Sequence, residues 1–439
     1  MTPEVKKRIE QIRQGIVPDG YTKTRSEITP TTWTPACLGD IYTERKEPGN
    51  ESLPLLTVSI HSGVSDGELD EDELPKKVKR IEDKSQYKRA ATGDLVFNMM
   101  RAWQGAIGTV RTEGMVSPAY IVAKPNGKVH PPFMDYYMKA PRMVGMINRQ
   151  SYGVTDFRKR LYWDSFAPIP CVLPPVREQR KIAEILSTQD KAVELQARKI
   201  EELKRFKKGC LEKLFPRKGQ KVPEKRFPGF TDDWEQRKFD EVFDCTVPNN
   251  TLSRAELSYD EGTVLNVHYG DVLIKYGSVL DVQKDDIPRI PHRCREDFNG
   301  ALLQDGDVII ADTAEDETTG KACEIGNLQG SAIVSGLHTM VCRPRNRMAL
   351  GYLGYYLNSN AYHHQLLPLM QGIKVLSLSR SNIQKTSVSY PIAVKEQQLI
   401  AYYFSQLDNL ITLHQRKCDE EKQKKKALMQ LLLTGIVRT

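Results

Sequence analysis

The chain has 439 residues and a net charge of +8, from 64 Lys and Arg against 56 Asp and Glu. This length allows two to four domains, and 39% hydrophobic residues are sufficient for ordinary cores. No apolar run approaches the ~20 residues of a membrane-spanning helix, and the first residues lack the apolar stretch of a signal peptide, so we expect a cytoplasmic protein with no membrane partner. The eight Cys are scattered without a C-x-x-C pair, which argues against a zinc site and a disulfide framework.

The predicted elements begin with a short amphipathic helix over residues 3–14. Thr2 suits its N-cap, Pro3 its first turn and Gly15 its C-terminal end. A stretch of short strands separated by turn residues follows, with strands expected at 55–60, 94–97 and 120–123. A helix is expected next, from residue 133 to about residue 148.

The most informative feature of the sequence is an internal repeat. Residues 178–214 align without a gap on residues 396–432, and 14 of these 37 positions are identical. Average composition would give roughly 2–3 identities. A Gly-Asp pair before an apolar run also recurs, at 93–94 and 306–307. The offset of 218 residues between the two helical segments is far too long for the repeat of a solenoid. The repeat therefore predicts two mixed α/β globules, each followed by one long polar helix.

Both repeated helices contain Ser-x-x-Asp, at 187–190 and 405–408, which is the spacing of a capping box. We therefore expect a kink at each serine, followed by a helix of ~27 residues that is ~40 Å long. Lys207 and Lys425 interrupt the apolar stripes of these helices, where they can extend to solvent or pair across the helices.

Matched apolar stripes at seven-residue spacing predict that the two helices pair antiparallel; two independent surface helices are the alternative. The expected pairing residues are Leu186, Val193, Ile200, Leu203 and Leu214 on the first helix, and Phe404, Leu407, Ile411, Leu428 and Leu432 on the second.

Motifs for catalysis are missing or explained by other features. The sequence has no phosphate loop, no dinucleotide-binding glycine motif and no H-E-x-x-H. His130-Pro-Pro-Phe133 is similar to the Asn/Asp-Pro-Pro-aromatic motif of amino-group methyltransferases, but His is a poor acceptor for the target amine, so we interpret the segment as a turn before a helix. Glu-x-Lys triplets at 82–84, 202–204 and 420–422 match part of a nuclease metal site, but ion pairing along a helix explains the last two. No catalytic and no metal-binding residue is predicted.

The repeated helices resemble the conserved regions of specificity (S) subunits of type I restriction-modification enzymes. The similar segments are 173–187 with 207–215, 226–235 and 396–435. The resemblance covers the whole chain, including the order of the repeat. It departs in one place, because Tyr390-Pro391 stands where the first copy has Pro174-Pro175.

The resemblance implies an α+β protein in which two mixed α/β target recognition domains are separated by long α-helices that form an antiparallel coiled coil. The expected boundaries are an N-terminal helix at 1–15, target recognition domain 1 at 16–170, a central conserved helical spacer at 171–222, target recognition domain 2 at 223–389 and a C-terminal conserved helical spacer at 390–439.

The function that the resemblance implies is non-catalytic recognition of a bipartite, asymmetric DNA site. The implied partners are double-stranded DNA, two methyltransferase (M) subunits and restriction/translocase (R) subunits. S-adenosylmethionine, ATP and Mg²⁺ are expected in those subunits and not in this chain. Two alternatives belong to other classes: a coiled-coil scaffold that binds no DNA, and a solitary DNA methyltransferase or nuclease, which would need a cofactor loop or a metal triad that the sequence lacks.

Direct readout of bases needs donors and acceptors on loops that reach the major groove. Basic, polar and aromatic residues near the ends of predicted elements are the candidates, although a solvated charge or a core aromatic ring is the alternative for each one. They are His61, Ser62, Arg101, Trp103, Gln104, Arg158, Lys159 and Arg160 in the first domain, and Tyr269, Lys275, Tyr276, Lys374 and Arg380 in the second.

Overall fold

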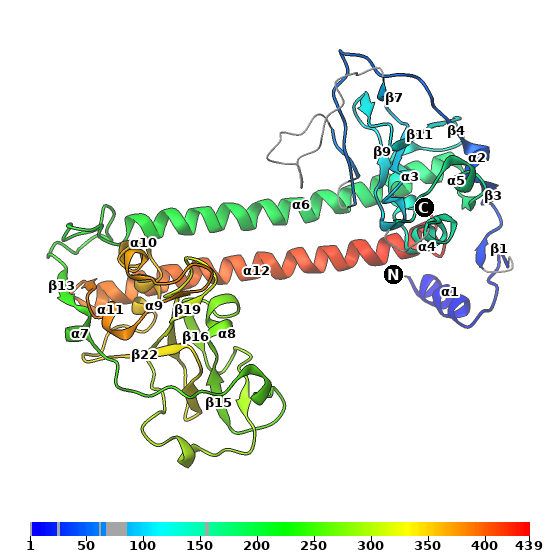
Figure 1. Ribbon diagram of the computed structural model, residues 1–439. Helices are drawn as coiled ribbons and strands as arrows, with labels where there is room; N and C mark the ends of the chain where they lie inside the picture. The colour runs from blue at the N-terminus through cyan, green and yellow to red at the C-terminus, as the bar shows by residue number, and fades with distance from the viewer. Residues whose placement is uncertain (1, 24–26, 61–62, 67–85, 154–157) are drawn as a thin grey trace. The chain divides into compact units, whose positions relative to one another are not determined.

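The computed structural model describes residues 2–23, 27–60, 63–66, 86–153 and 158–439 (Figure 1). The chain forms two compact units. The first joins Met1–Gln196 to Lys417–Thr439, and the second is Ala197–Arg416. Both contain helices and sheets, so the α+β class is confirmed. In the described part of the chain, every helix is too short or too polar to cross a membrane.

The first unit is built around a four-stranded antiparallel sheet in the order β4-β11-β8-β9. Four two-stranded pairs surround it: β1-β2, β5-β6, β7-β10 and β3-β12. The strands are β1 (Tyr21–Lys23), β2 (Ile28–Pro30), β3 (Thr34–Cys37), β4 (Tyr42–Glu44), β5 (Val58–Ser59), β6 (Gly63–Val64), β7 (Lys88–Ala90), β8 (Leu95–Asn98), β9 (Ile107–Thr109), β10 (Gly114–Val116), β11 (Tyr120–Pro125) and β12 (Pro170–Leu173). The helices are α1 (Pro3–Arg13), α2 (Leu38–Ile41), α3 (Pro131–Met138), α4 (Pro141–Gln150), α5 (Trp163–Phe166) and the first part of α6 (Val176–Lys213).

The second unit repeats this arrangement with additions. Its main sheet has the order β14-β22-β18-β20-β16, and a second sheet has the order β17-β15-β21. The strands are β13 (Glu235–Lys238), β14 (Phe243–Asp244), β15 (Val264–Val267), β16 (Val279–Asp281), β17 (Arg289–Ile290), β18 (Val308–Ala311), β19 (Thr313–Ala314), β20 (Ala322–Gly326), β21 (Ala332–Ser335), β22 (Thr339–Pro344), β23 (Leu376–Ser377) and β24 (Ser387–Tyr390). The helices are α7 (Phe239–Val242), α8 (Tyr269–Ile274), α9 (Tyr352–Leu357), α10 (Asn360–His363), α11 (Arg380–Ile383) and α12 (Val394–Leu433), the last of which begins here and ends in the first unit.

The repeated Gly-Asp pair plays the same structural part in both units. Gly93 and Gly306 have φ values of 92° and 90°, which a residue with a Cβ rarely adopts. The following aspartates are buried and each accepts hydrogen bonds from an arginine: Asp94 from Arg45 at 2.7 Å and Asp307 from Arg343 at 2.7 Å. The pair therefore ends a turn and directly precedes an inner strand of the main sheet, β8 or β18.

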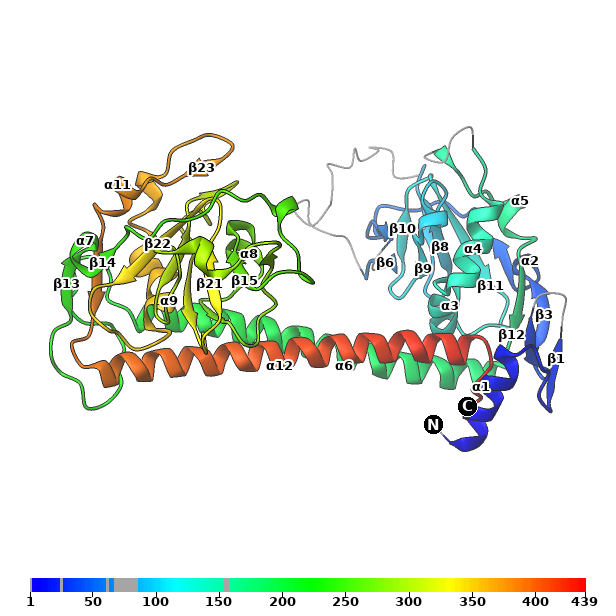
Figure 2. The same cartoon turned by 90° about the horizontal axis from the view of Figure 1, so that it is seen from below.

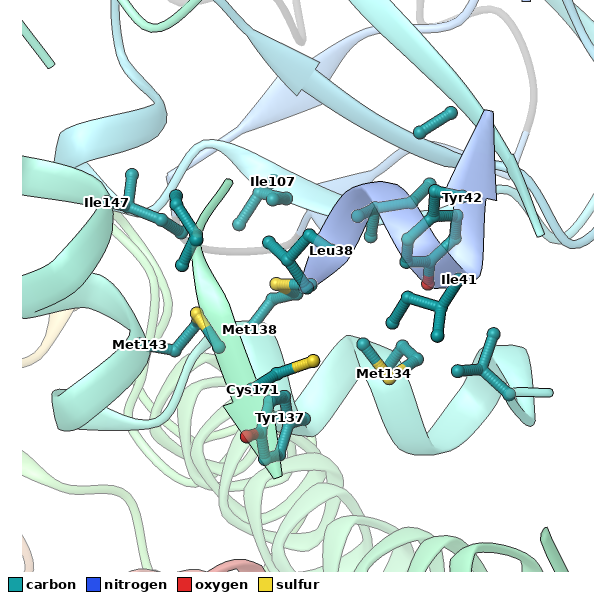
Figure 3. Packing of buried hydrophobic residues seen from close by; sticks show 14 of the residues in the cluster. Leu38, Ile41, Tyr42, Ile107, Met134, Tyr137, Met138, Met143, Ile147 and Cys171 are labelled. Atoms are coloured by element: carbon teal, nitrogen blue, oxygen red, sulfur yellow. The ribbon is translucent and has the colours of Figure 1, made fainter. Parts of the chain in front are cut away.

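The core of the first unit fills the space between the main sheet and helices α2, α3 and α4. Figure 3 shows Leu38 and Tyr42 from the α2–β4 segment facing Met134 and Met138 of α3. Two residues of α6, Ile182 and Leu186, are fully buried in the same cluster, together with Leu432 of α12. The described globule therefore packs directly against the first part of α6 and the last part of α12.

The core of the second unit has the same plan with larger aromatic residues. Phe404 of α12 corresponds to Leu186 of α6 in the repeat, and it stacks on Phe215 with ring centroids 5.9 Å apart. Ile400 and Leu407 of α12 lie in this cluster, and Cys210, Leu211 and Leu214 of α6 pack against it.

Two predicted elements of the first unit differ from the structure. The strand expected at 55–60 is reduced to Val58–Ser59. Leu55 forms only an isolated bridge with Met115, so the residues before Val58 are not part of a strand. The helix expected at 133–148 is two helices, because Pro141 forces the preceding residue, Ala140, into an extended conformation.

The kinks expected at Ser187 and Ser405 do not form, and α6 and α12 are continuous helices of 38 and 40 residues. Each serine hydroxyl donates to the carbonyl oxygen three residues earlier, so it does not cap a helix.

Within each unit, part of α6 lies beside part of α12 with opposite chain direction (Figures 1 and 2). In the first unit, Gln189 donates to the carbonyl oxygen of Glu421 at 3.0 Å, and Cys418 approaches the carbonyl oxygen of Val193 at 3.9 Å. Among the predicted pairing residues, Leu186, Ile200, Phe404, Leu407 and Leu432 are buried, whereas Val193, Leu203, Leu214, Ile411 and Leu428 are half-buried.

Candidate nucleic-acid interface

In the first globule, the candidate residues that the structure describes gather at the carboxyl end of β8. The chain leaves β8 through a short 3-10 helix, η3 (Ala102–Gln104), which exposes Arg101 and Gln104 and leaves Trp103 half-buried. The Trp103 indole nitrogen donates to the carbonyl oxygen of Met100 at 3.0 Å, which holds the ring against the turn. A guanidinium and an amide therefore project from a rigid turn.

The second candidate segment of this globule lies beside the first. The backbone N–H of Leu161 donates to the carbonyl oxygen of Met99 at 2.8 Å, and the Lys159 ammonium lies 5.8 Å from the centre of the Trp103 ring. Arg158 and Arg160 are exposed. The structure thus brings Lys159 and its neighbours to the β8 turn, although they are more than 50 residues away in sequence.

In the second globule, a corresponding edge lies where β15, β18 and β21 end. Tyr269 follows β15, and its ring lies edge-on to His338, with ring centroids 5.3 Å apart. The hairpin of residues 371–377, which contains β23, reaches the same edge. Thr313 pairs with Ser377, and the N–H of Leu378 donates to the carbonyl oxygen of Asp312 at 2.8 Å. Lys374 is exposed on this hairpin.

His338 and Asp312 belong to this edge but were missed by the sequence analysis. His338 lies in the turn between β21 and β22 with a φ of 54°, an uncommon conformation for a residue with a side chain. Its Nδ1 atom lies 3.5 Å from Asp312 Oδ1, and its side chain is 48% exposed. Such backbone conformations concentrate at functional sites. The neighbouring Gly336 signals a turn in the sequence, but nothing in the sequence indicates which residue is left-handed.

A buried polar network lies directly behind this edge. Asn266 is fully buried at the end of β15, and its Oδ1 atom accepts from Asn250 Nδ2 at 2.6 Å. His268 Nδ1 accepts from the N–H of Gly270 at 3.2 Å, so the neutral imidazole carries its proton on Nε2. Burial lowers the pKa of His268, which favours this neutral form.

The remaining predicted DNA-binding residues have other surroundings. His61 and Ser62 lie outside the described residues. Lys275 contacts Asp286 and Tyr259, with 3.0 Å between its Nζ atom and Asp286 Oδ2. Tyr276 is 3% exposed and packs in a core cluster of this unit, so its ring is not accessible to DNA in this structure. Arg380 is exposed in the first turn of α11.

The His130 segment and two of the three Glu-x-Lys triplets have structural roles, and the third triplet, at 82–84, lies outside the described residues. His130 precedes α3 as its N-cap, as expected for a turn, and its N–H donates to Gln179 Oε1 at 2.7 Å. Lys204 pairs with Glu201, and Lys422 pairs with Asp419, each one helical turn away. Among the described residues, no group of three or more His, Cys, Asp and Glu side chains is placed to hold a metal ion.

A protein-family model described as the type I restriction modification DNA specificity domain matches residues 76–205 and 231–422. Two relatives come from Methanocaldococcus jannaschii. The type I restriction enzyme MjaVIII specificity subunit is 24% identical over 316 residues, covering 70% of this chain and 70% of the relative. The putative type I restriction enzyme MjaX specificity subunit is 23% identical over 459 residues, covering 96% of this chain and 97% of the relative.

The fold is also found in a solved structure from a study of complex assembly and conformational transition of the type I R-M system. The two chains are 16% identical and align with a TM-score of 0.57 over 93% of this chain and 99% of the other. The family model extends over both repeats and well over half of the sequence. The protein therefore belongs to the family of type I restriction-modification specificity subunits, the chains that provide DNA sequence specificity.

Proposed function

We propose that this chain reads a bipartite, asymmetric DNA site, with one half read by each globule. The proposal rests on the observation that the two globules share an arrangement of strands and helices but expose different side chains at equivalent edges. The turn after β8 presents Arg101 and Gln104, whereas the equivalent edge after β18 presents Asp312 and His338. The same fold with different donors and acceptors reads two different sequences, so the site is not a palindrome.

The chemistry of these side chains suits base recognition. Arginine donates in bidentate fashion to guanine, and glutamine pairs with adenine, both in the major groove. In the second globule, the imidazole of His338 and the hydroxyl of Tyr269 are groups that can each donate and accept a hydrogen bond. Lys159 and Lys374 provide the positive charge that attracts phosphates.

We propose that α6 and α12 form an antiparallel coiled coil that separates the two globules. A 38-residue helix is ~57 Å long. Two half-sites on one face of B-DNA are about 34–36 Å apart, so a helix of this length spans the distance. The opposite direction of the contacts at Gln189 and Val193 supports this pairing.

The chain itself is proposed to be non-catalytic and to act in the cytoplasm within a larger complex. Several identical positions of the repeat are exposed, including Leu195 with its equivalent Leu413, which are 66% and 45% exposed, and Arg198 with its equivalent Arg416. Identical exposed residues on both copies suit two copies of one partner, the methyltransferase subunit. S-adenosylmethionine, ATP and Mg²⁺ would be bound by the methyltransferase and the restriction subunits.

Selection of a randomised DNA library by the complex with methyltransferase subunits tests the two-reader proposal. Substituting Arg101 or Gln104 by Ala should relax one half-site at a cost of ~1–3 kcal/mol per lost base contact, and His338→Ala should relax only the other. Lys46→Ala, an exposed cation of the first globule paired with Glu44, serves as the control. Equal changes in both half-sites after a substitution at residue 101 would contradict the proposal.

A further inference from the structure

The two lysines that interrupt the helix stripes take part in the same three-residue contact in both units. In the first unit, the Tyr136 hydroxyl donates to Asp190 Oδ2 at 2.7 Å, and Lys425 Nζ lies 2.5 Å from Asp190 Oδ1. The Lys425 ammonium is also 5.8 Å from the centre of the Tyr136 ring. We call this set the Tyr–Asp–Lys contact.

The second unit contains an equivalent contact. The Tyr355 hydroxyl donates to Asp408 Oδ2 at 2.8 Å, Lys207 Nζ lies 2.5 Å from Asp408 Oδ1, and the ammonium is 5.2 Å from the Tyr355 ring centre. The aspartates and the lysines are each related by the repeat offset of 218 residues.

Each contact joins three elements that are distant in sequence. The tyrosine belongs to a helix of the globule, α3 or α9, and the aspartate to the long helix that follows this globule. The lysine belongs to the other long helix. One carboxylate therefore ties a recognition globule to both helices.

The position of the Tyr–Asp–Lys contact restricts the orientation of the globule on the long helix. Ile182 and Leu186 of α6 are fully buried against the first globule, and Asp190 follows one turn after Leu186. Apolar packing on the earlier turns is not directional, whereas hydrogen bonds to a carboxylate restrict both distance and angle. The contact thus fixes the globule on the helix one turn beyond the fully buried Leu186.

The residue types indicate that the Tyr–Asp–Lys contact fixes the relative position of the elements more than it stabilises the fold. The Lys207 and Lys425 side chains are only 20% and 31% exposed, at positions where an apolar residue would continue the stripe. Partly buried ion pairs add little net stability, but polar groups in a helix interface select one register. Burial and the adjacent carboxylate raise the pKa of both tyrosines, so both phenols stay protonated and donate at neutral pH.

We propose that the two Tyr–Asp–Lys contacts are positioning contacts that hold each recognition globule at a fixed angle on the helix pair. They determine which gap between the two half-sites is accepted, and they leave the bases that are read unchanged. The inference rests on the proposed two-reader function.

The test uses the full chain with its methyltransferase subunits and DNA duplexes that carry both half-sites at gaps up to two base pairs shorter or longer than the natural one. Tyr136→Phe removes one hydroxyl and keeps the ring. Tyr137→Phe is the matched control, because this neighbouring tyrosine on α3 bonds to Val172 within the globule.

We expect Tyr136→Phe to reduce the preference for the natural gap over its neighbours by about fivefold or more, since a hydrogen bond to a charged group is lost. The base preferences should not change, and Tyr355→Phe should act in the same way through the second globule. Tyr137→Phe should keep the wild-type preference.

An unchanged gap preference in Tyr136→Phe would overturn the inference, as would an equal change in Tyr137→Phe. If the wild-type complex bound DNA without any sequence preference, the proposed two-reader function itself would fail. Lys425→Met provides a second test, since it removes the charge and keeps an unbranched side chain that suits the stripe. It should relax the gap preference like Tyr136→Phe, and an unchanged preference would again contradict the inference.

Discussion

Glu324 in the second globule is a buried carboxylate with two backbone partners. It is 1% exposed, and its oxygens accept from the N–H groups of Gly351 and Gly354 at 2.9 and 2.8 Å. These groups belong to the start of α9, where a negative charge is favourable. Burial nevertheless outweighs these bonds and raises the pKa of Glu324 from 4.5 to about 7.

This raised pKa predicts a loss of stability with rising pH. The folded chain binds the proton more tightly than the unfolded chain, so the free energy of unfolding should fall between pH 4.5 and about 7. The fall should be at most about 3.5 kcal/mol, at about 1.4 kcal/mol for each pKa unit. Denaturant unfolding of Glu324→Gln should lack this component, whereas the exposed Glu261→Gln should keep it. A Glu324→Gln variant with the wild-type pH dependence would contradict the assignment.

Residue identities in the repeat were readable from the sequence, but their roles were not. Glu178 accepts from Trp33 Nε1 at 3.3 Å and pairs with Arg438 at 2.6 Å, and its equivalent Glu396 pairs with Arg226 at 2.7 Å. These partners are 145 to 260 residues away in the first unit. Only the fold brings them together, so spacing along a helix could not reveal them.

At the scale of elements, long-range periodicity was more informative than local capping patterns. The stripes on α6 and α12 identified Leu186, Phe404 and Leu432 as buried residues. The Ser-x-x-Asp pattern was misleading, because Asp190 and Asp408 bind a lysine and a tyrosine instead of a backbone amide.

Equal insertions in both long helices should lengthen the gap between half-sites. Asp190 and Lys207 are 17 positions apart, as are Asp408 and Lys425. Four residues inserted after Lys199 and four after its repeat equivalent, residue 417, would add ~6 Å, or slightly more than one turn, to each helix. The methylated site should then accept a gap about two base pairs longer, at ~3.4 Å per base pair.

The control for this design is an insertion after Lys199 alone. This insertion lengthens the spacing from Asp190 to Lys207 and leaves the spacing from Asp408 to Lys425 unchanged. The two Tyr–Asp–Lys contacts then cannot form at the same time, so methylation activity should fall. A fully active double-insertion variant with the natural gap would show that the helices do not set the distance.

At the scale of the whole molecule, the duplication predicts that one half can pair with itself. The repeat places Lys207 at the position of Lys425. Arg226 pairs with Glu396 in the same way that Arg438 pairs with Glu178, the repeat equivalent of Glu396. In a two-fold pair of residues 1–230, each Lys207 would reach the Asp190 of the other copy. Sedimentation should show a dimer of this fragment, and Asp190→Lys should make it monomeric. A monomeric wild-type fragment would contradict the prediction.

The class, the duplicated order of elements and the absence of recognised catalytic motifs could be read from the sequence because they depend on composition and repetition. The proposed reading surface could be derived from the sequence only in part. Arg101 and Gln104 follow a recognisable strand, whereas Tyr276 belongs to the core and His338 depends on a left-handed turn. Side-chain burial is set by contacts between distant segments, which periodicity over a few residues does not record.

Sequencing of methylated DNA from the host, with and without this chain, tests the central claim most directly. The account predicts a bipartite, asymmetric methylated site that disappears when the chain is removed. It also predicts that this site returns with a change in only one half when the chain carries Arg101→Ala. Methylation that persisted unchanged without the chain, or a restored site altered in both halves, would contradict the account.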